Sequence, residues 1–199
     1  MSDEHETLEA RVPESLSSAV AERVAAAERD SVAQRLRVGD PTLWAPEATP
    51  EVANRLGWLT IASRMKDELA RIEAFSGELR ADGIEDIVLL GMGGSSLAPE
   101  VLRRAFGASP GHPRLNVLDS TDAQTVAAVA ARVEPARTLF IVSSKSGGTI
   151  EPLSLFAHFH SLIEDGSHFV AITDPGSGLE ELARTQGFRA GEVTIEKGS

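Results

Sequence analysis

Residues 87–100 read IVLLGMGGSSLAPE, and this stretch decides the fold. Its first four residues form an apolar run without polar alternation, which predicts a strand buried on both faces. Three glycines and two serines follow, and Pro99 then stands in the first turn of the next helix, where proline loses no useful N–H. A buried strand, a glycine-rich turn and a helix together indicate one unit of a parallel α/β sheet.

Three further apolar runs repeat this pattern along the chain. They lie at residues 115–118, 138–142 and 169–172, and a segment of helix length separates each run from the next. Parallel strands joined by helical crossovers form a three-layer α/β sandwich. A weaker run at 193–195 adds a fifth strand. We therefore expect a three-layer sandwich around a parallel five-stranded sheet of the flavodoxin-like kind.

The first 82 residues have a helical pattern instead. Apolar residues recur at helical spacing over 14–38, where Gly39-Asp40-Pro41 ends the helix. A second helical stretch runs from Thr49 to about Arg80, with Gly57 and Gly77 as the candidate interruptions. We expect residues 1–82 to form an N-terminal helical extension and residues 83–199 to form the sheet domain.

Composition and charge exclude several classes of function. The chain has 199 residues, no cysteine and a formal net charge of −11, from 30 acidic and 19 basic residues. This net charge disfavours binding to nucleic acid and to anionic membranes, since both require a positively charged surface area. The absence of cysteine excludes disulfides and thiolate metal sites, and the acidic start of the chain is unlike a secretory signal. We expect a cytoplasmic protein that binds neither nucleic acid nor membrane.

The loops that follow the strands are the candidate sites, because ligands of open parallel sheets bind beyond the carboxyl ends of the strands. The loop after the first strand carries Gly94 and Ser95 and leads into a helix whose free N–H groups point at the same place. The loop after the third strand, residues 143–152, reads SSKSGGTIEP. Hydroxyl groups, one ammonium group and glycine amides are suited to hold phosphate oxygens. The two loops predict one phosphate site.

The remaining polar residues predict structural roles. Asp122 or Thr121, and Ser177, stand where helix caps belong after the second and fourth strands. His158 and His160 lie two apart on a predicted helix and so face different directions, which suits a metal ion poorly. We expect neither a metal ion nor a cofactor.

Two other phosphate-binding motifs compare less well with these loops. A nucleotide P-loop requires Gly, four residues and then Gly-Lys-Ser/Thr, and neither loop contains it. A dinucleotide fingerprint is matched in part by residues 91–96, with Ser96 in place of the third glycine and with Asp119 where a ribose-binding acid belongs. That interpretation leaves the loop around Lys145 without a role. A nicotinamide-dinucleotide-binding domain stays open as an alternative.

The two loops, with Leu-Asp-Ser-Thr-Asp at 118–122 between them, resemble the first sugar-isomerase (SIS) domain of the glucose-6-phosphate isomerase family. The resemblance covers residues 58–190 and is greatest to the isomerase part that some bacteria fuse to a transaldolase. Gly148 departs from the threonine common at its position. The resemblance implies that the substrate phosphate is held by Gly94, Ser95, Ser144, Lys145, Ser146 and Thr149.

The same resemblance implies an aldose–ketose isomerase that interconverts glucose 6-phosphate and fructose 6-phosphate, usually as a homodimer. In this family the histidine, glutamate and arginine that act on the sugar belong to later motifs and to a second SIS domain. We therefore expect no catalytic residue in this chain, which represents the N-terminal phosphate-binding part. A non-catalytic SIS module that senses sugar phosphates is the alternative.

Overall fold

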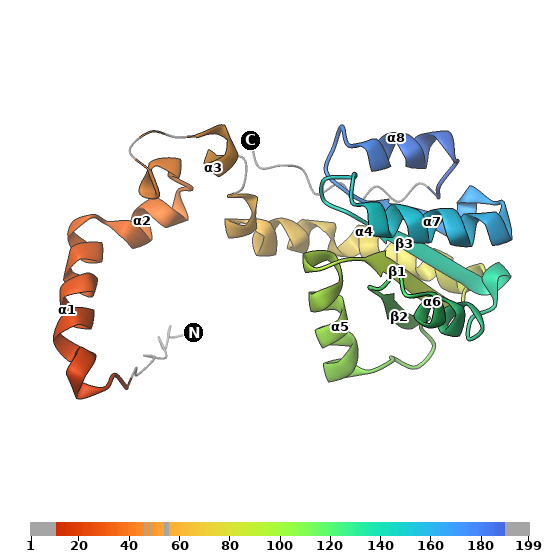
Figure 1. Ribbon diagram of the computed structural model, residues 1–199, viewed down its shortest axis with the longest axis horizontal. Helices are drawn as coiled ribbons and strands as arrows, with labels where there is room; N and C mark the ends of the chain where they lie inside the picture. The colour runs from red at the N-terminus through yellow and green to blue at the C-terminus, as the bar shows by residue number, and fades with distance from the viewer. Residues whose placement is uncertain (1–10, 46, 48, 54–55, 190–199) are drawn as a thin grey trace. The chain divides into compact units, whose positions relative to one another are not determined.

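The chain forms two compact units, divided at residues 62 and 63 (Figure 1). The computed structural model describes residues 11–45, 47, 49–53 and 56–189. The boundary expected from the sequence lies later, between residues 82 and 83. The reason is helix α4, Ile61–Ala81, because its last turns bury Leu79 against the sheet.

The smaller unit is built of short helices. The single helix expected over 14–38 is a wrong prediction, because Ser31 adopts a left-handed conformation with φ of 50° and breaks it in two. The second piece ends before Gly39, as expected. Hydrogen bonds from Thr42 and Arg35 then fix the following turn and lower the pKa of Asp40 to about 2. The elements are α1 (Glu14–Arg29), α2 (Val32–Arg37), a 3-10 turn (Pro41–Leu43), α3 (Pro50–Ala53) and a 3-10 turn (Gly57–Leu59).

The larger unit contains a sheet whose four described strands are all parallel, in the order β2-β1-β3-β4. Each strand lies within two residues of the apolar run that predicted it, because continuous apolar runs are what a sheet covered on both faces requires. The fifth predicted strand, at 193–195, lies outside the described residues. The strands are β1 (Asp86–Gly91), β2 (Arg114–Leu118), β3 (Thr138–Ser143) and β4 (Phe169–Ile172).

Helices cover the sheet and complete the α/β sandwich. Successive side chains of β3 face opposite sides, so Leu139 packs with Leu79 of α4 whereas Phe140 packs with Phe159 of α7. The rings of Phe140, Phe159 and Phe169 stack at centroid distances of 4.6 and 5.2 Å. The helices that follow the strands are α5 (Gly94–Phe106), α6 (Ala123–Ala130), α7 (Ile150–Ile163) and α8 (Gly178–Thr185), with 3-10 turns at Pro135–Arg137 and Gly166–His168.

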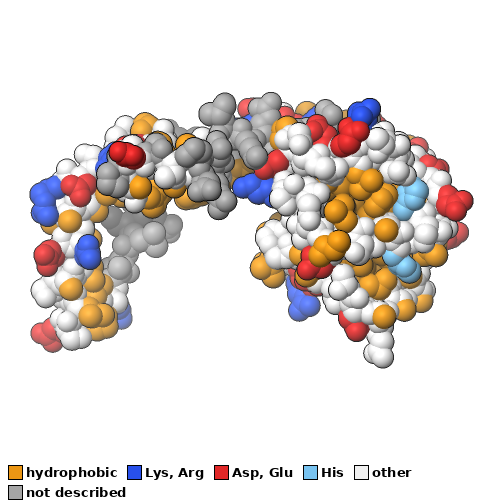
Figure 2. Space-filling view, turned by 45° about the horizontal axis from the view of Figure 1, so that its top comes forward, with side chains coloured by type: hydrophobic (Ala, Val, Ile, Leu, Met, Phe, Trp, Pro, Cys, Tyr) orange, Lys and Arg blue, Asp and Glu red, His pale blue; other side chains and the backbone are white. Residues whose placement is uncertain are grey.

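The surface carries mixed charge and also exposed apolar side chains. On the face that Figure 2 shows, acidic and basic side chains are interspersed and no continuous basic area forms among the described residues. Helix α5 is largely exposed, since Ser96 is its one buried side chain and its apolar residues Leu97, Val101 and Phe106 face solvent. None of the helices in the described part of the chain combines the length and the apolar character needed to cross a membrane.

Candidate phosphate-binding site

The strand order creates a switch point between β1 and β3. From β1 the chain moves outward to β2, and from β3 it moves outward to β4 on the other side. The two loops therefore diverge at the carboxyl edge, where open α/β sheets bind their ligands. The last residues of the two strands, Gly91 and Ser143, are paired in register. The two loops singled out in the sequence thus begin side by side (Figure 1).

The first loop packs closely on the second. A Cβ atom on Gly91 would lie 3.1 Å from the Cβ of Ser95 and 3.5 Å from the Cβ of Ser143, so a side chain there would require the start of α5 to shift by a few tenths of an ångström. Gly93 has φ of 55°, which turns the chain into α5 at the exposed Gly94. Ser95 is half-buried beside Gly91, at the side of the second loop.

The second loop divides its hydroxyl groups between inside and outside. Ser144 is buried, and its Oγ donates to Oγ1 of Thr149 at 3.0 Å. Because Oγ1 of Thr149 accepts this bond, the Thr149 hydroxyl keeps its own hydrogen for a ligand. Lys145 and Ser146 are exposed. Among the described residues, the Lys145 ammonium group has no acceptor or ion-pair partner.

The loop after β4 holds the second loop in shape. The N–H of Ser144 donates to the carbonyl of Ile172 at 3.0 Å, and the N–H of Asp174 donates to the carbonyl of Lys145 at 3.1 Å. Gly147, at φ of 68°, comes so close that a Cβ there would lie 2.6 Å from the Cβ of Ser177. Sequence reasoning missed this clamp, because nothing in the residue pattern says which loops touch.

The four helices that follow strands differ at their amino ends. Asp122 caps α6 by accepting from the N–H of Thr125. This hydrogen bond and the one from the Thr125 hydroxyl group lower the pKa of Asp122. Ser177 caps α8 by accepting from the N–H of Glu180. Both caps confirm the sequence interpretation. In contrast, α5 and α7, which start at the switch point, have no side-chain cap from any described residue.

Backbone donors are left over at these uncapped ends. In the first loop, the N–H groups of Gly93 and Gly94 make no hydrogen bond to any described residue. In the second loop the same holds for the N–H groups of Lys145, Ser146 and Thr149. Free amides at helix amino ends, together with a lysine, form a site for an oxyanion. The strand order also differs from the 3-2-1-4 order of dinucleotide-binding sheets, in which the third strand pairs with the second.

Known proteins resemble the chain in sequence. Residues 24–172 match the family model described as phosphoglucose isomerase. A glucose-6-phosphate isomerase from Synechococcus sp. (strain JA-2-3B'a(2-13)) is 34% identical over 169 residues, which cover 76% of this chain and 30% of that protein. One from Thermosynechococcus vestitus is 34% identical over 147 residues, which cover 65% of this chain and 27% of that protein. The chain spans about a third of the length of the curated relatives that it matches.

Solved structures resemble the chain in fold. A glucose-6-phosphate isomerase from Chlamydia trachomatis aligns with a TM-score of 0.56 at 28% identity, over 75% of this chain and 27% of that one. A hypothetical protein from Thermus thermophilus aligns with a TM-score of 0.59 at 27% identity, over 84% of this chain and 41% of that one.

Proposed function

The chain belongs to the phosphoglucose isomerase family, and on that premise we propose that it binds the phosphate group of a hexose 6-phosphate. The protein would act as an aldose–ketose isomerase on glucose 6-phosphate and fructose 6-phosphate, in the cytoplasm and as a homodimer. This chain supplies the N-terminal phosphate-binding part. Membership of the family and the relatives named above support the reaction; the geometry of the two loops supports the phosphate.

One observation carries the proposal: the two helices that start at the switch point have no cap from the described residues, whereas α6 and α8 are capped by Asp122 and Ser177. An uncapped helix end leaves N–H groups that a bound anion can satisfy. A role in folding alone would favour a capping side chain at all four helices, because a cap contributes about 1 kcal/mol. The free donors are found where the two loops begin side by side.

Each residue of the proposed site then has a definite task. Gly94 and Ser95 present the amino end of α5, and Lys145 supplies the positive charge. Ser146 and Thr149 supply hydroxyl donors. Buried Ser144 acts from beneath by orienting Thr149 at 3.0 Å. We assign no acid–base group to this chain.

Binding the phosphate serves the reaction at a distance. The phosphate of a hexose 6-phosphate is remote from C1 and C2, between which the proton moves. Binding energy from such a non-reacting part positions the substrate and offsets the cost of reaching the enediol-like transition state. The function of these loops is therefore to hold and align the substrate.

Titration with fructose 6-phosphate tests the proposal. We expect the largest backbone amide shifts at residues 94–96 and 144–149, because the phosphate accepts from the amides of both loops. Fructose without phosphate serves as the control ligand and leaves these amides unshifted. The amides of α6 serve as the internal reference, since Asp122 already satisfies that helix end. Shifts confined to other parts of the chain, or none at high ligand concentration, contradict the proposal.

A further inference from the structure

A hollow of about 470 Å³ lies at the opposite edge of the sheet, where the strands begin. It is lined by Arg80, Glu85, His112, Arg114 and Arg137 together with Gly83, Ile84 and Gly111. Strand β1 spans six residues, so at about 3.3 Å per residue its two ends lie about 17 Å apart. The hollow is therefore separate from the site at the carboxyl edge. Its volume lies in the range of small-molecule sites.

Positive charge is concentrated in this hollow. Three arginines line it, Glu85 is the single carboxylate of the described lining, and Asp86 pairs with Arg114, which leaves one positive charge in excess. The chain as a whole carries a net charge of −11. Charge beyond a Debye length of about 8 Å is largely screened, so an anion in the hollow responds mainly to the arginines.

Two of the arginines are fixed in place. Buried Asp86 receives two hydrogen bonds from Arg114, at 3.1 and 2.7 Å, and this pairing raises the pKa of Arg114. Arg137 lies 2.7 Å from Glu85 and donates from Nε to the carbonyl of Gly83. Each guanidinium has five N–H groups, so donors remain on both after these contacts. Fixed donors lower the entropy that a ligand has to overcome on binding.

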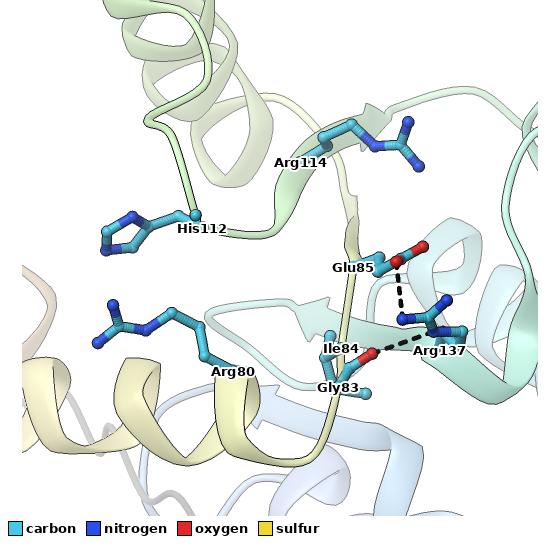
Figure 3. A pocket seen from close by; sticks show the side chains of 8 residues that line it. Arg80, Gly83, Ile84, Glu85, His112, Arg114 and Arg137 are labelled. Carbon is cyan, nitrogen blue, oxygen red and sulfur yellow. Dashed lines mark hydrogen bonds and ion pairs between the residues drawn. The ribbon is translucent and has the colours of Figure 1, made fainter.

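Arg80 is the uncommitted cation of the hollow. Its Nε donates to the carbonyl of Ser76 at 3.3 Å, and within the described part of the chain no carboxylate pairs with it. In Figure 3 the Arg80 guanidinium and the His112 ring lie on the same side of the view, and both extend away from the Glu85–Arg137 pair. His112 lies with Nδ1 3.2 Å from the carbonyl of Pro110. Because a carbonyl only accepts, Nδ1 carries the proton in this contact, and Nε2 of that tautomer is an acceptor for a ligand hydroxyl.

We propose that this hollow at the amino edge of the sheet is a second anion site, which binds a phosphate group. Arg80 donates to the phosphate oxygens, and Nε2 of His112 accepts from the P–OH group of hydrogen phosphate. Hydrogen phosphate suits the hollow better than a carboxylate, because it has oxygens that accept from Arg80 and also a hydroxyl group that donates to His112. The proposal does not depend on the phosphate site at the carboxyl edge.

Inorganic phosphate is the probe for the test, titrated into the whole chain at constant ionic strength. We expect amide shifts at Gly83 and Gly111, which lie in the two turns of the hollow. Arg80→Gln is expected to weaken this binding about fivefold to tenfold, as for the loss of one exposed charged hydrogen-bond donor. Arg71→Gln is the matched control, because Arg71 lies on the same helix, pairs with Glu68 and does not line the hollow.

The two sites are separated by a second variant. In the Lys145→Ala variant, we expect that phosphate no longer shifts the backbone amides of Gly94 and Gly148. It still shifts those of Gly83 and Gly111. The proposal is overturned if Gly83 and Gly111 do not shift in the wild-type chain, or if Arg80→Gln binds there as tightly as Arg71→Gln. If only Gly94 and Gly148 show no amide shift in the wild-type chain, the proposed function is contradicted and the second site is still supported.

Discussion

Lys145→Ala is expected to weaken the binding of fructose 6-phosphate by about tenfold to a hundredfold, since a charged hydrogen bond contributes about 1.5–3 kcal/mol. The melting temperature is expected to stay unchanged. The structural contacts of Lys145 run through its backbone carbonyl, which accepts from the N–H of Asp174 and survives the substitution. Calorimetric titration measures the affinity, and thermal unfolding of the same samples measures the stability.

Lys66 provides the matched control for charge. It is exposed on α4 and belongs to neither loop, so Lys66→Ala removes the same unit of charge from the chain and leaves the residues of both loops unchanged. We expect its affinity for fructose 6-phosphate to equal that of the wild type. Lys145→Arg is expected to restore part of the affinity, because it restores the charge with a different shape. A large loss of stability in Lys145→Ala instead identifies a structural lysine and removes it from the site.

Phe140→Ala is expected to lower the free energy of unfolding by about 3–5 kcal/mol, the range for removing a buried phenylalanine. Phe140 is fully buried in β3, and its ring stacks on Phe159 at 4.6 Å and on Phe169 at 5.2 Å. The substitution leaves a cavity at the centre of the cluster between the sheet and α7. Since domains of this kind are stable by about 5–15 kcal/mol, this loss is a large share of the total. Denaturant unfolding measures it.

Phe106 supplies the comparison within the same chain. It stands at the end of α5 and is 82% exposed, so Phe106→Ala removes the same side chain without opening a cavity. We expect its free energy of unfolding to stay within about 0.5 kcal/mol of the wild type, as for most surface substitutions. Equal losses in the two variants would mean that the cluster around Phe140 is not the core of the larger unit.

The sheet and its loops were predictable from the sequence for a physical reason. Strands buried on both faces must be apolar without alternation, so the continuous apolar runs at 87–90 and 138–142 identify these strands directly. The caps at Asp122 and Ser177 were predictable as well, because a capping side chain acts within three residues of itself. Signals of this kind are local, and so a single sequence contains them.

The features that the sequence did not predict depend on contacts between distant parts of the chain or on the conformation of a single residue. The break at Ser31 replaces one continuous helix by two, although the apolar spacing runs on through it. The clamp between Gly147 and Ser177 joins loops that are about thirty residues apart in the sequence. The arginine hollow gathers Arg80, Arg114 and Arg137 from three separate segments at the edge where strands begin. None of these residues lies at the carboxyl end of a strand, where ligands of open parallel sheets are expected.

A crystal structure of this chain with fructose 6-phosphate tests most directly whether the loops after β1 and β3 form one site. We expect the phosphate at the switch point, within hydrogen-bonding distance of the amino end of α5 at Gly94 and Ser95 and of Lys145 and Thr149 in the second loop. A sugar phosphate bound to one loop without the other, or bound only elsewhere on the chain, would contradict the shared site and the function proposed from it.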